Sequence, residues 1–412
     1  MKSGEQQEVT QALSEISARL RALKTPLPPL PRWSIMAEGI EEAHRLFGLA
    51  VDAVVSVIDV HAKRCSSDRT DYRTWRDRLA LLSERVDQMR DLGHTLFNRD
   101  FETLIYHYIF VWELLECVRG KPLDARQKFV VLPTGDHEVW LLNTRLMNLA
   151  PPEWFNESDL SCLLQISKEK PLIAFECNPD RVFEDNAILA HEILHALVML
   201  EGDVAKAIRD LCSKGGPTQL AVGKGGKQNC DHYEELFCDY AAAWVYGPVS
   251  LQAFAREIAL DSGRSSRTHP AGAVRAKLLL SCHSRYRNHR AYTELKQYLK
   301  LRGGDNLPSE EDLQKVGSHF GQILEGMGLT EFRAEDRREE VKVLFDNNIP
   351  FATDDVRTLL NNLPDRGQLR KPEKYVDLTV ESLRKIHILR QVKAHLRDSD
   401  ALFAFPKGLS GE

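Results

Sequence analysis

Two histidines separated by three residues carry the clearest chemical signal in the sequence. His191 and His195 enclose Glu192 in the pattern His-Glu-Ile-Leu-His. On a helix, residues four apart lie on one face, one turn above the other. Two neutral imidazoles at that spacing can bind one Zn²⁺ at about 2.0–2.1 Å. Glu192 is too close in sequence to be a third ligand on that face, but it is placed to take a proton from a water that the metal activates.

The residues around this pattern predict a helix. Asp185 or Asn186 is a suitable N-cap, and Gly202 is a suitable stop. Between them apolar residues recur without a helix breaker: Ile188, Leu189, Ile193, Leu194, Leu197, Val198 and Leu200. The histidines and the glutamate are therefore polar side chains in a largely buried helix. Such a pattern also arises by chance, and its histidines are then buried in a core with ordinary hydrogen-bond partners. The pattern therefore indicates a metal site only if the chain also supplies a third ligand.

A second helix, predicted for residues 231–246, supplies the candidates for that ligand. Glu235 and Asp239 are four apart and share a face that is otherwise apolar. Buried acids are costly unless they are paired or bind a cation. We expect Glu235 to be the third ligand, and Asp239 to accept a hydrogen bond from a ligating histidine and fix its tautomer. The competing third ligands are Glu234, His232 and Cys238.

The main alternative for these acids is a cluster that favours the helix dipole. It explains Glu234, near the start of the helix, better than Asp239, which lies further along. A third block follows at Thr268-His-Pro, where Pro270 can begin a helix. His269 at that entrance could donate to the oxyanion of a tetrahedral intermediate, and Arg275 could pair with a carboxylate. A surface histidine and a solvated arginine are the plainer interpretation of this block.

Taken together, the three blocks resemble the gluzincin metallopeptidases of the prenyl-protein (CaaX) protease and heat-shock membrane protease type, and their soluble minimal relatives. The blocks are HEILH at 191–195, ELFCD at 235–239 and THPAGAVR at 268–275. The resemblance covers roughly residues 130–285 and implies a zincin core that hydrolyses peptide bonds. It implies Zn²⁺ held by the two histidines and Glu235, with Glu192 as general base and acid. It also implies that His269 steadies the transition state, that Asp239 supports a ligand and that Arg275 holds the site together.

Composition places the chain among ordinary globular proteins. Its 412 residues, 43% hydrophobic and 28% charged, suffice for two or three domains. The net charge of -5 makes nucleic-acid binding unexpected. The first twenty residues are polar and no apolar run reaches about 18 residues, so we expect neither a signal peptide nor a membrane span. Eight cysteines without CxxC spacing predict free thiols, a cytoplasmic location and no cysteine-built zinc site.

The order of patterns predicts an α+β fold, mostly α, with a gluzincin-like core flanked by helical domains. We expect four segments: an N-terminal helix and Pro-rich linker (1–33), a bundle of three long helices (34–124), the metallopeptidase core (125–289) and a C-terminal helical domain (290–412). Short β-like runs near 128–133, 138–143 and 171–176 predict a small sheet. One of its edges could bind an extended substrate.

These observations predict a zinc-dependent endopeptidase with a specific protein or peptide substrate, in which the flanking helices set substrate choice or respond to a regulatory protein partner. One alternative is a catalytically silent helical scaffold with a structural metal site. Such sites usually have four protein ligands, and they have no use for a base such as Glu192. Another alternative is an aminopeptidase. The C-terminal third also ends in a basic region, which usually indicates a solvated helix face, although an acidic partner or nucleic acid is an alternative.

Overall fold

The computed structural model describes residues 3–24, 26, 34–65, 71–97, 101–118, 128–134, 138–149, 165–177, 186–213, 230–260, 269–302, 307–333 and 335–403. The chain divides into two compact units. Unit 1 comprises Met1–Tyr108 and Arg126–Cys177, and unit 2 comprises Ile109–Ala125 and Asn178–Glu412. The segments predicted from the sequence have other boundaries: the segment 125–289 is shared between the units. The Pro-rich run at 27–33 lies outside the described residues.

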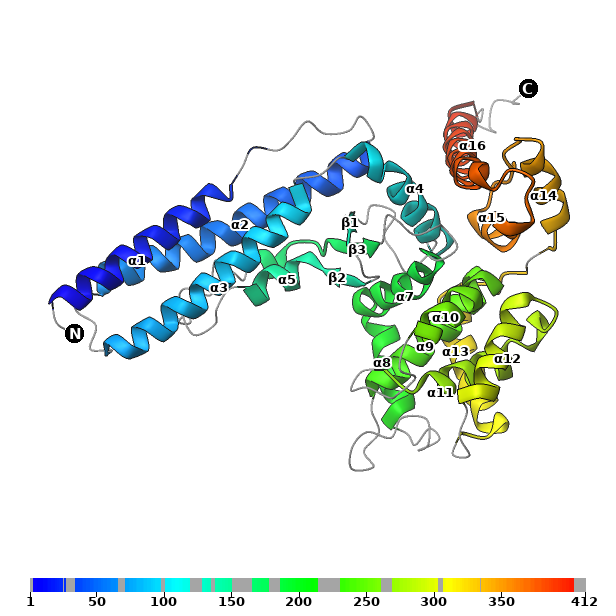
Figure 1. Ribbon diagram of the computed structural model, residues 1–412, viewed down its shortest axis with the longest axis horizontal. Coiled ribbons are helices and arrows are strands. Elements are labelled where there is room, and N and C mark those ends of the chain that lie inside the picture. Colours follow the sequence, from blue (N-terminus) through cyan, green and yellow to red (C-terminus); the bar gives the residue numbers. More distant parts are fainter. Residues whose placement is uncertain are drawn as a thin grey trace, which may run out of the picture. The chain divides into compact units, whose positions relative to one another are not determined.

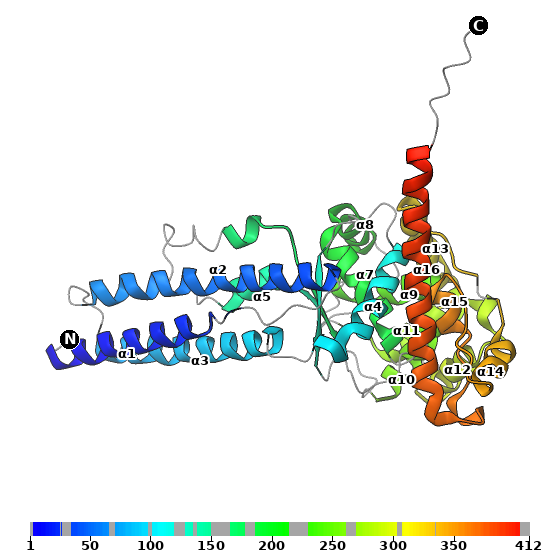
Figure 2. The ribbon, with the colours of Figure 1, turned by 90° about the horizontal axis from the view of Figure 1, so that it is seen from above.

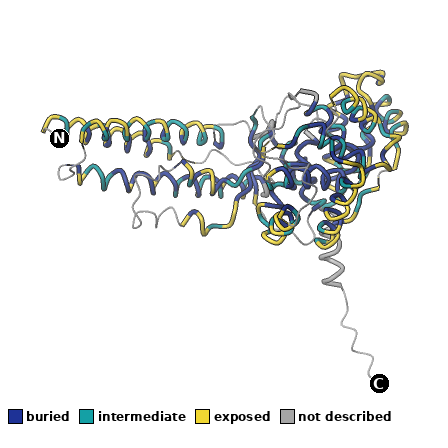
Figure 3. The backbone as a smooth tube through the Cα atoms, turned by 90° about the horizontal axis from the view of Figure 1, so that it is seen from below, coloured by how far each residue is buried: buried dark blue, intermediate teal, exposed yellow. Residues whose placement is uncertain are grey.

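Long amphipathic helices form most of unit 1 (Figure 1). They are α1 (Ser3–Ala22), α2 (Ser34–Arg64), α3 (Tyr72–Phe97), the beginning of α4 (Phe101–Val118) and α5 (Leu142–Leu149). Helices α1, α2 and α3 pack against one another along their length (Figure 2). Their inner faces are buried and their outer faces exposed (Figure 3), as the periodicity of apolar residues requires.

The sequence predicted a bundle of α2, α3 and α4, whereas the structure packs α1 with α2 and α3. The cause is a stripe of buried residues along α1: Val9, Leu13, Ile16 and Leu20. These residues recur at spacings of three and four, and they join the core that also holds Phe47 and Trp75. The end of α4, from Ile109 onwards, belongs to unit 2.

A three-stranded sheet completes unit 1, close to where the sequence predicted strands. Its order is β1 (Phe129–Pro133), β3 (Ile173–Cys177), β2 (Val139–Leu141), with β1 parallel and β2 antiparallel to β3. Side chains alternate between the two faces along each strand. One face carries Leu132 and Glu176, which are paired in the register of the sheet.

Unit 2 is helical among its described residues and centres on one buried helix, α9 (Cys230–Tyr246). Helix α9 contacts α7, α8, α10, α11 and α13, and most of its residues are buried. The other elements are the end of α4, η2 (Asn186–Ile188), α7 (Leu189–Leu200), α8 (Gly202–Ser213), α10 (Pro248–Leu260), α11 (Gly272–Cys282), η3 (Ser284–Tyr286), α12 (Arg290–Arg302), α13 (Glu310–Gly326), α14 (Arg338–Asp346), α15 (Val356–Asn361), η4 (Arg366–Gln368), η5 (Pro372–Lys374) and α16 (Tyr375–Phe403).

Helix α10 is an element that the sequence interpretation did not include. Gly247 and Pro248 end α9, as predicted, because Gly247 adopts a left-handed conformation with φ 82°. Pro248 is also the first residue of α10, a position where proline's missing N–H costs nothing. The chain therefore reverses within one residue and lays α10 back against α9.

The structure contradicts the prediction of free thiols throughout. Cys212, near the end of α8, and Cys230, the first residue of α9, form a disulfide with 5.7 Å between their Cα atoms. The other described cysteines are free thiols: Cys65, Cys117, Cys177, Cys238 and Cys282. Because the cytoplasmic location was inferred partly from free thiols, that inference loses this support.

The coarse fold class is confirmed: the described chain is mostly helical, with one small sheet. None of the described helices combines the length and the hydropathy that crossing a membrane requires.

Candidate metal centre

Helix α7 carries the two histidines, but its ends differ from those predicted. The turn Asn186–Ile188 is 3₁₀-helical, and the α-helix begins at Leu189 without a side-chain cap. Asp185 lies outside the described residues. At the other end, Glu201 is extended, and Gly202 begins α8 instead of stopping α7. The interior is as expected, because its apolar residues and His191 are buried.

Three donor groups converge between α7 and α9. His191 Nε2 and His195 Nε2 lie 3.0 Å apart. The two carboxylate oxygens of Glu235 lie 3.4 Å from His191 Nε2 and 3.3 Å from His195 Nε2. Ligands at about 2.0–2.1 Å from a tetrahedral Zn²⁺ are separated by roughly 3.3 Å. The three distances therefore fit a donor set around one small cation, and the ligand atoms all lie within 4.8 Å of one another.

The other nitrogen of each histidine faces a carboxylate. Asp239 Oδ1 lies 3.0 Å from His191 Nδ1, and Glu234 Oε1 lies 3.1 Å from His195 Nδ1. An ionised carboxylate only accepts hydrogen bonds, so it favours the tautomer with the proton on Nδ1. Both Nε2 atoms then present lone pairs toward the space between them. Carboxylates behind ligating histidines are a general feature of metal sites.

Arg275 on α11 stabilises the acid behind His191. Its Nε and NH2 donate to the two oxygens of Asp239 at 2.6 and 2.8 Å, which is a bidentate pair. Its NH2 also lies 3.5 Å from Glu235. The guanidinium is held by the Phe254 ring of α10, 4.7 Å from the ring centre. Helix α10 therefore has a direct part in positioning this network.

The charges of the cluster favour a divalent cation. Burial alone would raise the pKa of Glu235, but hydrogen bonds from the two neighbouring imidazoles in their protonated, metal-free form hold it far below its usual range. Burial is likewise outweighed at Asp239, whose pKa is lowered by Arg275. Glu234, Glu235 and Asp239 with one guanidinium give the cluster a formal charge of −2 when the imidazoles are neutral. Glu235 Oε2 is buried and lies 3.5 Å from Arg275 NH2, but it accepts no hydrogen bond from a described residue, so its charge is only partly compensated.

The two residues expected to act on a substrate lie at the edge of this cluster. Glu192 is partly exposed, and burial raises the pKa of its carboxyl against the opposing effect of both imidazoles. The side chain of His269 is 52% exposed, and its Nε2 lies 3.4 Å from Glu235 Oε1. Burial lowers the pKa of His269, so the neutral imidazole is favoured. The structure thus brings His269 beside the third candidate ligand.

All seven residues expected at the site lie in unit 2. The three residues that competed with Glu235 as third ligand do not belong to the donor group. Glu234 faces the Nδ1 side of His195, away from the converging Nε2 atoms. His232 and Cys238 are buried on α9 but do not join the three-residue donor group. Sequence reasoning missed the position of Glu234 behind His195. The signal was the pair Glu234-Glu235, because consecutive residues on a helix point about 100° apart and can approach one imidazole from two sides.

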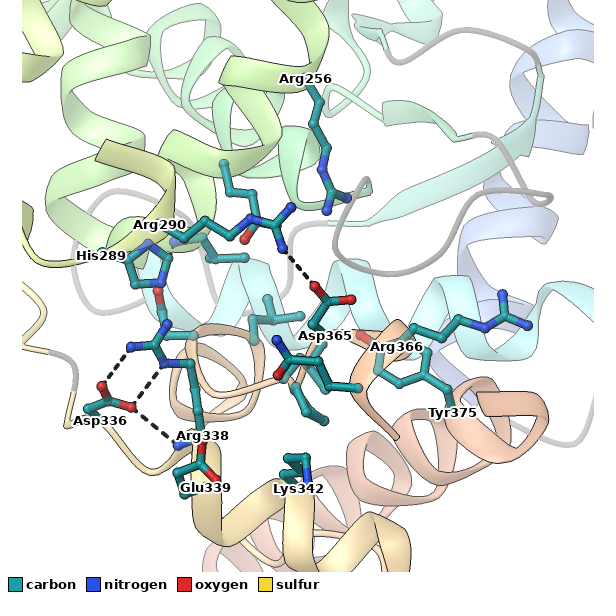
Figure 4. Close-up of a pocket in the computed structure, with 17 residues that line it drawn as sticks. Arg256, His289, Arg290, Asp336, Arg338, Glu339, Lys342, Asp365, Arg366 and Tyr375 are labelled. Carbon is teal, nitrogen blue, oxygen red and sulfur yellow. Dashed lines mark hydrogen bonds and ion pairs between the residues drawn. The ribbon is translucent and has the colours of Figure 1, made fainter. Parts of the chain in front are cut away.

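A small cavity lies behind His191, beside Asp239. It measures about 10 Å³, has room for about a single water molecule, and its lining includes neither His195 nor Glu235. A much larger pocket of about 500 Å³ lies elsewhere in unit 2 (Figure 4). Its charged groups include ion pairs, such as Arg290 with Asp365 at 2.9 Å. None of the three candidate metal ligands lines this larger pocket.

No family model matches the chain, and neither a curated protein nor a solved structure matches it.

Proposed function

We propose that the chain is a zinc-dependent peptidase in which His191, His195 and Glu235 bind the metal. The observation that supports it is the pair of Nε2 atoms 3.0 Å apart, each on an imidazole whose Nδ1 faces a carboxylate. A zinc ion bound there would polarise the scissile carbonyl and lower the pKa of a water molecule. We propose a zincin core of the gluzincin type for α7, α9 and α11, on the resemblance of their sequence blocks to that family.

The residues of the chain then have separate tasks. Glu192 takes a proton from the attacking water and passes it to the leaving amine. His269, which is half exposed, donates to the oxygen that becomes negative in the transition state. Asp239 and Glu234 fix the tautomers of the ligating histidines, and Arg275 keeps Asp239 ionised. The proposed substrate is an internal peptide bond of a protein or peptide.

The decisive experiment compares the purified wild-type chain with Glu192→Gln. Because Glu192 is not a ligand, the variant should contain as much zinc as wild type by elemental analysis. Cleavage of casein and of a mixed peptide library, followed by mass spectrometry, should fall by at least about a hundredfold. Products cut internally support an endopeptidase, and stepwise loss of N-terminal residues would identify an aminopeptidase. Zinc-dependent products that are the same for both proteins would contradict the role of Glu192.

A structural metal site is the second candidate, and one observation favours it. His269 Nε2 lies 3.4 Å from Glu235 Oε1, close enough to be considered as a fourth ligand. Structural zinc sites are closed by four protein ligands, whereas catalytic sites keep one position for water or substrate. The variant His269→Ala separates the candidates. Retained zinc with lost cleavage supports the enzyme, and lost zinc with lower thermal stability supports the structural site.

A further inference from the structure

Unit 1 contains a pocket that plays no part in the proposed metal chemistry. Its volume is about 530 Å³, which lies in the range of small-ligand sites. It opens on the face of the sheet that carries Leu132, Trp140 and Glu176, at the carboxyl ends of the parallel strands β1 and β3. In open sheets with parallel strands, ligands bind at this end. Helices α3 and α5 supply the rest of the lining.

The pocket contains a carboxylate that lacks a cationic partner among the described residues. Glu176 Oε1 accepts a hydrogen bond from Trp140 Nε1 at 3.0 Å, and Oε2 accepts one from Thr134 Oγ1 at 3.1 Å. These neutral donors fix the carboxylate in place without cancelling its charge. A carboxylate has about four acceptor sites, so the two bonds leave positions for a further donor. Glu176 is therefore an oriented anionic group facing a cavity.

Two arginines line the same pocket, and neither forms an ion pair with a described carboxylate. Arg85 on α3 donates from NH1 to Gln88 at 2.9 Å, while its Nε is buried without a hydrogen-bond partner among the described residues. Arg145 on α5 lies 5.8 Å from the centre of the Trp140 ring. A buried donor without a partner is costly, and a ligand carboxylate would remove that cost. Guanidinium groups suit this role because they bind carboxylates with two parallel hydrogen bonds.

The comparison with the pocket of unit 2 shows that this arrangement is unusual within the chain. There the cations and acids neutralise one another, as in the pair of Arg338 with Asp336 at 2.7 Å (Figure 4). In the unit 1 pocket, the carboxylate of Glu176 and the guanidinium groups of Arg85 and Arg145 line one cavity but form no ion pair with one another. Asp91, the other acid of that lining, pairs with Arg90 at 3.1 Å. The unit 1 pocket therefore has a negative and a positive site for the opposite charges of one ligand.

We infer that this pocket binds a zwitterionic ligand, either a free amino acid or a short peptide with free ends. Glu176 receives the ammonium group, and Arg85 and Arg145 receive the carboxylate. Arg145 and Glu176 flank the same indole ring. Two extended residues span at most ~7 Å, and a hydrogen bond adds about 3 Å at each end, so a dipeptide is long enough to extend across the indole ring from Glu176 to Arg145. Apolar lining from Leu92 and Leu149 favours an apolar side chain.

The test uses four probes. The dipeptide Ala-Phe, its N-acetyl form and its C-terminal amide differ only in their ends, and the fourth probe is free phenylalanine. The readout is the indole N–H resonance of Trp140 in the full chain labelled with ¹⁵N-tryptophan, assigned by its absence in Trp140→Phe. We expect Ala-Phe to shift this resonance, and we expect either blocked form to bind at least about tenfold more weakly. Equal affinity for Ala-Phe and both blocked forms, or no shift with any probe, would overturn the inference.

Variants then assign each charge. Glu176→Gln keeps an acceptor for the indole N–H and should abolish the difference between Ala-Phe and its N-acetyl form. Arg85→Gln, alone or with Arg145→Gln, should abolish the difference between Ala-Phe and its amide. Arg76→Gln is the matched control, because Arg76 is an exposed residue of α3 outside the lining and should leave both differences intact. If the Glu176 and arginine variants discriminate among the probes as wild type does, the assignment is wrong.

Free phenylalanine separates the two sources of the ligand chemistry. Affinity equal to that of Ala-Phe identifies an amino-acid site, and weaker binding identifies a peptide site. The inference does not depend on the metal centre, since the pocket and its residues lie in unit 1. Binding of Ala-Phe by a Glu192→Gln chain should be unchanged, so the failure of either proposal leaves the other standing.

Discussion

Unit 2 contains two buried groups of carboxylate, imidazole and guanidinium that solve the problem of buried charge differently. One is the candidate metal centre. In the other, Glu113 on α4, with a fully buried side chain, lies between His387 and Arg390 of α16. His387 Nδ1 lies 2.9 Å from one oxygen of Glu113, and Arg390 Nε lies 2.9 Å from the other. The one carboxylate of the second group therefore has a guanidinium to balance its charge.

The difference lies in the number of acceptors that face one another. In the Glu113 group a nitrogen of α16 lies 2.9 Å from each carboxylate oxygen, and only His387 forms a hydrogen bond there. The guanidinium of Arg390 balances the charge of the one buried anion as an ion pair. In the metal centre three carboxylates share one guanidinium, and two Nε2 atoms face each other at 3.0 Å. Residue types alone therefore do not identify a metal site. An excess of converging lone pairs with a net negative charge does.

The largest expected effect is the loss of metal when a ligand is removed. His191→Ala should reduce bound zinc from about one ion per chain to about none, because two remaining donors do not hold a tetrahedral cation. The measurement is elemental analysis after dialysis. His387→Ala is the matched control, since it removes a buried imidazole that also pairs with a carboxylate. Equal zinc loss in both variants would contradict the claim that only the group containing His191 binds zinc.

The sequence predicted the metal centre better than it predicted the Glu113 group. HExxH and ExxxD are local patterns whose partners lie four residues apart, so helix geometry alone places each pair on one face. No local pattern in the sequence links Glu113 to Arg390 or His387. The pairing of Glu113 with Arg390 joins positions 277 residues apart, and only the packing of α16 against α4 reveals it.

For the helices and strands too, local patterns could be predicted from the sequence, whereas long-range packing could not. The helices and strands are close to the predicted ranges because each has its own apolar period. The packing of α1 in place of α4 depended on which of several similar stripes meet, and a single helix does not contain that information. Helix α10 was missed because Gly247-Pro248 was interpreted only as a stop, although a proline also suits the first turn of a following helix. Its Phe254, which holds Arg275, was missed with it.

The second expected effect is a loss of stability when the Glu113 group is broken, without any change in zinc binding. Glu113→Ala leaves Arg390 and His387 without their shared carboxylate, and breaking a buried ion pair costs about 3–5 kcal/mol. Chemical denaturation should show this loss as a lower midpoint. Zinc content should stay at the wild-type value, because no residue of this group belongs to the donor set. A stability loss below about 1 kcal/mol would place this pair among ordinary surface ion pairs.

The smallest expected effects compare the two acids behind the histidines. Asp239→Asn and Glu234→Gln each keep the shape of the side chain and remove its charge. Loss of such a supporting acid lowers metal affinity by about 10–100-fold. Asp239 should lie at the upper end of that range, because its side chain is 1% exposed and also pairs with Arg275. Glu234 should lie at the lower end, because its side chain is 34% exposed and solvent already weakens its field.

Competition with a zinc chelator measures both affinities on one scale. We expect the wild-type chain to bind zinc most tightly, Glu234→Gln to bind it more weakly, and Asp239→Asn to bind it most weakly. The reverse order would mean that Glu234 itself coordinates the metal, a role for which the sequence made it the leading competitor. In that case the carboxylate would have to leave His195 Nδ1, from which it lies 3.1 Å in the structure. Such a result would replace Glu235 as the third ligand while leaving the two histidines in place.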